Sequence, residues 1–150
     1  MKREPIYVAL ANLVFNAPTV KAAYVSTGRY LFHHSQVPGG ASAMPAIYLN
    51  QAGENHVRAG KGVPDKRTLR CQFVLYFSTP DPQAGLLAAT ACNVGLDAID
   101  DAVNLPGNPQ NVQTLGGLVE HVYIEGAVQT FEGLLQDISV VVVPITIVIP

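Results

Sequence analysis

The sequence predicts a single α+β domain: one antiparallel or mixed β-sheet with two helices packed on one of its faces. Two helical patterns are separated by several strand-like segments. The helices are therefore too few and too badly placed for a parallel sheet in which helices alternate with strands. The 150 residues fit one domain, 49% of them are apolar, and no repeat or break in composition divides residues 1–150.

Two segments carry a helical pattern. The first is predicted from Arg3 to Phe15, where Pro5 suits a first helical turn and apolar residues recur on one face. The second follows Asp81 as N-cap and Pro82 at the first helical position, and its apolar residues recur every three or four residues from Ala89 to Val103. A Leu-Pro-Gly sequence then ends it.

Five segments carry strand patterns: Tyr24 to His34, Pro45 to Gln51, Thr68 to Phe77, Leu118 to Phe131 and Ile138 to Ile149. The third alternates with period two, which predicts one face in a core. The last is apolar on both parities, so we expect either a central strand or a strand with a helix on one face and a neighbouring subunit on the other. Pro144 complicates a central position because it lacks a ladder donor. A turn is predicted at Glu132-Gly133.

The segment from Gly53 to Lys66 holds three glycines, one proline and most of the local charge. This composition predicts a long, mobile connection between two strands. Loops of this length inside a small domain are usually functional or disordered.

Charged residues make up only 13% of the chain, against about a quarter in typical domains. A low charge content predicts that a partner covers part of the surface, as in an oligomer.

The net charge is −2 and no long basic run occurs, which argues against nucleic-acid specificity. No secretory signal is visible and the apolar C-terminal run is too short to span a bilayer as a helix, so we expect a soluble chain.

No constellation of residues points to catalysis, so we predict that the chain is not an enzyme and has no catalytic, cofactor or metal site. His33 and His34 would point to opposite faces of a strand. Cys71 and Cys92 fit no zinc or redox spacing and are interpreted as buried free thiols. Gly60-Lys61-Gly62 lacks the spacing of a phosphate-binding loop.

Asp97, Asp100 and Asp101 form an acidic stripe near the end of the second helix. The simpler interpretation is the solvated face of an amphipathic helix. Carboxylates late in a helix oppose its dipole, however, so a nearby divalent cation is the alternative.

Five segments, taken in order, resemble one protein family. They are Arg3-Glu4-Pro5-Ile6-Tyr7, "PAIYLNQAGE" (Pro45 to Glu54), "LRCQFVLYF" (Leu69 to Phe77), "LDAIDDAV" (Leu96 to Val103), and the close "QTLGGLVEHVYIEG" followed by "VVVVPITIVIP". Their joint order is similar to the tail terminator or tail-completion proteins of long-tailed phages and prophages, with the lambda-type terminator fold. The similarity covers nearly the whole chain, and all five segments are fold patterns rather than chemical signatures.

The resemblance implies a structural protomer that assembles as a ring, expected to be hexameric. Such a ring caps the tail tube, ends its polymerisation and gives the head a docking surface. The partners implied are further copies of the chain, the tail tube protein and a head-completion or connector protein. The implied location is the virion tail, after assembly in the host cytoplasm. The family has no catalytic residues to carry over.

Four basic residues in and beside the glycine-rich segment are candidate interface residues: Arg58, Lys61, Lys66 and Arg67. We hypothesise that they contact acidic surface on the tube protein or on an adjacent subunit; the alternative is that they only solvate a loop. Rival functions are a head–tail connector or other minor tail protein, and, further away, a small α+β enzyme or a host-directed effector.

Overall fold

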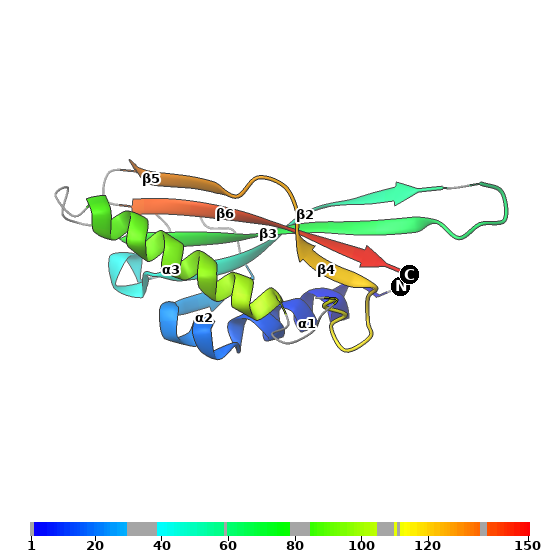
Figure 1. Cartoon of the computed structure of the whole chain (residues 1–150), viewed down its shortest axis with the longest axis horizontal. Coiled ribbons are helices and arrows are strands. Elements are labelled where there is room, and N and C mark those ends of the chain that lie inside the picture. The colour runs from blue at the N-terminus through cyan, green and yellow to red at the C-terminus, as the bar shows by residue number, and fades with distance from the viewer. Residues whose placement is uncertain are drawn as a thin grey trace.

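The computed structural model describes residues 2–29, 39–58, 60–78, 85–104, 110, 112–135 and 138–150. Within these residues the chain forms one mixed six-stranded sheet and three α-helices, and the helices lie on one face of the sheet (Figure 1). This arrangement confirms the predicted α+β class.

The N-terminal helix α1 (Arg3–Phe15) has the predicted bounds. A second short helix, α2 (Pro18–Ala23), was not predicted; it begins with Pro18 in its first turn, so this proline opens a helix as well as ending the preceding segment. The strand prediction from Tyr24 is therefore wrong at its start, because Tyr24 is the C-cap of α2 and β1 covers only Ser26–Gly28. The rest of that predicted strand lies largely outside the described residues.

The long helix α3 (Gly85–Val103) confirms the second predicted helix. The proposed cap at Asp81 and Pro82, and the Leu-Pro-Gly sequence after the helix, lie outside the described residues. Thr19 of α2 donates from its Oγ1 to the carbonyl oxygen of Ala98 at 3.3 Å, which ties α2 to α3. A 3-10 helix, η2 (Gly40–Ala43), precedes the second strand.

The strand order is β1-β2-β3-β6-β4, with β5 also paired to β6. The longer strands are β2 (Ala46–Val57), β3 (Lys66–Ser78) and β6 (Ile138–Ile149). β1 runs parallel to β2, whereas the other pairs are antiparallel.

The fourth predicted strand is in fact two strands, β4 (His121–Ile124) and β5 (Gln129–Leu135), which lie end to end along the same edge of β6. The turn predicted at Glu132-Gly133 is wrong, because both residues lie within β5. The pairing with β6 is irregular here, because Phe131 pairs with Val140 and Leu135 with Ile138, so the register shifts across this segment.

β6 lies inside the sheet, and Pro144 is tolerated there because the pairing of β6 with β4 and β5 is interrupted at this residue. β4 pairs with Ile145–Val148 and β5 with residues up to Val142, so Pro144 lies between the two paired stretches. The Pro144 carbonyl accepts from the Glu125 N–H at 3.2 Å, on the β4 side. Because the N and C=O of a strand residue point the same way, the missing N–H faces this break and removes no bond to β3.

The main core lies between the sheet and the helices. Its largest fully buried side chains include Leu10, Val14, Leu69, Phe73, Leu75, Ile99, Ile145 and Ile147. A second, smaller cluster on the opposite sheet face contains Tyr48, Val74 and Tyr76, with the rings of the two tyrosines 6.1 Å apart. The face of β6 towards the helices is buried, whereas Val140, Val142 and Val148 on the opposite face are only partly buried.

Both cysteines are free and buried, which confirms their interpretation. Burial raises the pKa of the Cys71 thiol to about 12, so it is protonated at neutral pH.

Gly95 marks the closest approach between α3 and the sheet. A Cβ there would lie 2.5 Å from the Tyr24 Oη and 2.6 Å from the Phe77 Cζ. The Tyr24 Oη is itself buried without a hydrogen-bond partner among the described residues.

We predict that Gly95→Ala lowers the free energy of unfolding by about 1–2 kcal/mol, because overpacking outweighs the helix propensity gained. Tyr24→Phe removes an unpaired buried hydroxyl and is expected to be neutral or slightly stabilising. It should also relieve part of the Gly95→Ala loss, since the nearest clashing atom is gone. Urea denaturation of the two single variants and the double variant measures this coupling. Strict additivity would contradict the predicted contact.

Candidate assembly interface

The most prominent surface feature is a β-hairpin arm, residues 53–69, made of the ends of β2 and β3 and their connection. Its base, residues 67–69, pairs with the end of β6, and its outer end extends beyond β6, away from α2 (Figure 1). The prediction of a long loop over Gly53 to Lys66 is wrong in part, because Gly53–Val57 is strand and β3 already begins at Lys66. Polar residues and a glycine are typical both of strands that are exposed to water on two faces and of loops. Composition alone therefore does not distinguish the two.

A β-bulge at the base of the arm sets which side chains face α1. Gln51 pairs with Cys71 and Gly53 with Arg70, which leaves Ala52 without a partner in β3. An extra residue reverses the faces of all residues that follow it. Glu54 consequently lies opposite Leu69, a residue of the helix-side core, and faces the start of α1.

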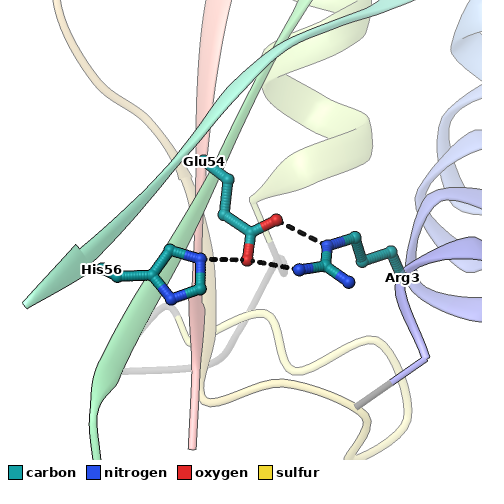
Figure 2. A network of polar contacts seen from close by, with 3 residues as sticks. All are labelled: Arg3, Glu54 and His56. Carbon is teal, nitrogen blue, oxygen red and sulfur yellow. Dashed lines mark hydrogen bonds and ion pairs between the residues drawn. The ribbon is translucent and has the colours of Figure 1, made fainter.

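Glu54 joins the arm to α1 through a polar network (Figure 2). The Arg3 guanidinium donates from Nε to Oε2 of Glu54 at 2.5 Å and from Nη2 to Oε1 at 2.8 Å. The His56 Nε2 lies 2.6 Å from the same Oε1. The hydrogen bond from Arg3 is the main cause that lowers the pKa of Glu54. A fork-like, charge-assisted contact of this kind is geometrically specific, so it fixes where the arm leaves the body.

A second ion pair holds α1 one residue further on. Arg29 donates to the Glu4 carboxylate, and its guanidinium carbon lies 5.9 Å from the centre of the Tyr7 ring. The signal for the Glu54 network, which the sequence analysis missed, is a carboxylate and a histidine two residues apart on one strand. Its partner Arg3 is 51 residues away in the chain, so only the fold identifies it.

Three of the four predicted interface residues lie at the exposed end of the arm, and the fourth, Arg67, lies where β3 begins to pair with β6. Arg58 and Lys61 lie in or beside the connection, and Lys66 and Arg67 begin β3. They are four of the nine lysines and arginines of the chain. Arg58 lies 3.7 Å from the Asp65 carboxylate with its side chain 77% exposed, so this pair contributes little stability. The structure thus gathers these charges on one projecting element, and their contact with a partner stays a prediction.

Two valines make the end of the arm partly apolar. Val57 is 53% exposed and Val63 is 50% exposed. The arm tip, which we define as residues 57–67, therefore combines cations with uncovered apolar side chains.

The acidic stripe lies elsewhere, on α3. Asp97, Asp100 and Asp101 are exposed, and partial burial, followed by the charges of the other two, raises the pKa of Asp100. Asp97 and Asp101 border a shallow groove of about 350 Å³ between α2 and α3, which we call the α2–α3 groove. Its remaining lining is Thr19, Ala22, Ala23, Val94 and Ala98.

No described group of three or more His, Cys, Asp and Glu side chains is placed to hold a metal ion. His33 and His34 lie outside the described residues. His56 belongs to the Glu54 network, and the His121 ring packs 4.8 Å from the ring of Tyr123. In the described part of the chain, no helix is long and apolar enough to cross a membrane.

The fold resembles that of a chain in the virion of a native gene transfer agent particle. The TM-score is 0.51 at 12% sequence identity, and the match covers 95% of this chain and 90% of the other. Such a low identity shows a shared fold and no more. No protein-family model matches the chain, and no curated protein matches it either.

The Glu54 network makes the arm sensitive to acid. The pKa of Glu54 is lower in the folded chain, so its stabilising contribution is complete above the unfolded value of about 4.3 and is lost as pH falls through the folded value. We expect the ¹³C carboxyl NMR titration of Glu54 to have its midpoint below that of a free glutamate. Arg3→Met should return the midpoint towards about 4.3.

The matched control is Arg29→Met, which removes the partner of Glu4 instead. It should shift the midpoint of Glu4 and leave that of Glu54 in place. An unchanged Glu54 titration in Arg3→Met would contradict the clamp between α1 and the arm.

Proposed function

We propose that this chain is a non-enzymatic structural protein of a phage, prophage or phage-like particle, and specifically a tail terminator. In this proposal it forms a ring, expected to be hexameric, that caps the tail tube, ends its polymerisation and presents the docking surface for the head. Its partners are further copies of itself, the tail tube protein and a head-completion or connector protein. It is assembled in the host cytoplasm and remains in the virion tail.

The observation that carries the proposal is the fold similarity to a chain of the gene transfer agent virion, because it extends over nearly the full length of both chains. It agrees with the order of segments that resembles tail terminators. Fold similarity supports a function only by analogy, so independent physical features of the chain matter as well.

Two such features favour assembly. Charged residues make up only 13% of the chain, and a projecting arm can contact a different surface on a neighbour. A contact between two unlike surfaces is heterologous. Repeated from copy to copy, it generates a closed ring when the successive rotations add up to a full turn. An enzymatic function would not account for the projecting arm. The buried Cys71 and Cys92 also lack the exposed setting of a nucleophile.

A head–tail connector is the second candidate. The similar chain belongs to a virion, and the fold similarity does not specify its role there, so the same observation supports a connector. Loss of the protein distinguishes the two by electron microscopy of particles. Tails of excess length indicate a terminator, whereas tails of normal length that lack heads indicate a connector.

The oligomeric state of the purified chain tests the proposed ring directly. Light scattering of the purified chain over a range of concentrations should find a discrete oligomer near six copies. Repeating the measurement with divalent cation tests whether the stripe of Asp97, Asp100 and Asp101 responds to it. A monomer under all conditions would remove the main physical support for a ring.

Charge reversal tests the role of the basic residues of the arm in tail termination. Charge reversal by Arg58→Glu with Lys61→Glu should abolish tail termination and leave the circular dichroism spectrum and melting temperature unchanged, because both side chains lie at the exposed end of the arm. Normal numbers of infectious or gene-transferring particles from the variant would exclude a role for these charges.

A further inference from the structure

The arm tip and the α2–α3 groove are complementary in charge and in apolar character. The tip carries Arg58, Lys61, Lys66 and Arg67 against one carboxylate, Asp65. The groove is bordered by Asp97 and Asp101, and Asp100 follows on the same helix. Among the described residues, none of these three aspartates forms an ion pair with a lysine or arginine of the same chain. The acidic field of the groove is therefore left for an external cation.

Apolar side chains match as well. Val94, on the lining of the groove, is 54% exposed, and the neighbouring lining residues Ala22, Ala23 and Ala98 are small. The groove is consequently shallow and apolar with acidic borders. The arm tip offers Val57 and Val63, each at least half exposed, among its cations. Burial of these valines against small residues would stabilise the contact, while the charges would set its orientation.

The two surfaces lie at opposite parts of the molecule. The groove lies between α2 and α3, and the arm projects from the other end of the sheet (Figure 1). The bulge at Ala52 and the clamp from Arg3 to Glu54 hold the base of the arm in that direction. The arm of one chain is thus directed away from its own groove.

We infer that the arm tip of one copy docks in the α2–α3 groove of a second copy, with the arm cations facing Asp97 and Asp101. The inference rests on the proposed ring and names the contact that builds it. Each copy then offers one arm and one groove, so the contact is heterologous and repeats from copy to copy. Since the charges are largely exposed before contact, salt should weaken the assembly.

The test uses two charge-reversed variants of the full chain, Lys61→Glu with Lys66→Glu in the arm and Asp97→Lys with Asp101→Lys in the groove. None of these four side chains takes part in an ion pair within the described residues. Each variant alone places like charges at every contact, which should raise the concentration needed for half-assembly at least about 100-fold. Light scattering should therefore find each variant as a monomer.

An equimolar mixture of the two variants should assemble again. In an alternating ring, the reversed arm meets the reversed groove, and the unchanged arm meets the unchanged groove. Every contact is then between opposite charges, and only even-numbered rings close. Recovery of the wild-type mass by mixing is the expected result, and it cannot come from variants that fail to fold.

Matched controls reverse exposed charges outside both surfaces: Lys2→Glu and Glu120→Lys should assemble as wild type does. If wild type forms a ring and the arm and groove variants do so too, the inference is wrong and the ring stands. The inference also fails if the mixture stays monomeric, if only one of the two variants loses assembly, or if wild type is monomeric throughout. Rings of normal mass that fail only in particle assembly would show that the arm binds another virion protein.

Discussion

The antiparallel pairing of β3 with β6 is the interaction on which the rest of the structure depends. The two strands pair without interruption from Arg67 opposite Ile149 to Ser78 opposite Ile138. On one side this pair buries Leu69, Phe73 and Ile147 against the helices. On the other side it carries Val74 and Tyr76, which form the second cluster. A ladder of this length also gives β2 on one flank, and β4 and β5 on the other, a rigid strand to pair with.

The same pairing accounts for the arm. β6 ends opposite Arg67 of β3, so only the last β2–β3 pair, Val57 with Lys66, and the connection between them pass beyond the three-stranded part of the sheet. Glu54 lies just before this point, and its contacts with Arg3 and His56 attach the base of the arm to α1 (Figure 2). The arm is anchored at its base and free to meet a partner at its tip.

The chain has few charged residues, and its basic and acidic residues gather on different parts of the surface. Arg3 and Arg29 pair with Glu54 and Glu4 and orient α1. Most of the remaining basic charge lies at the arm tip, and an acidic group lies on α3. This segregation fits a protein that recognises surfaces, since complementary patches steer and orient association more than they add to affinity. It also fits the proposed place in a particle, where one small protomer must meet several neighbours.

The sequence by itself determined the α+β class, the bounds of α1, the long strands β3 and β6 and the burial of both cysteines, because each depends on a local periodicity that one core enforces. It also identified the four basic residues as a group, since they are close in the chain. Only the tertiary structure decided that Gly53–Val57 is strand, that β5 continues through Glu132-Gly133, and that Pro144 lies at a break in pairing. Those outcomes depend on which partner strand is available. Contacts such as Arg3 with Glu54 join residues far apart in the chain, and no local pattern encodes them.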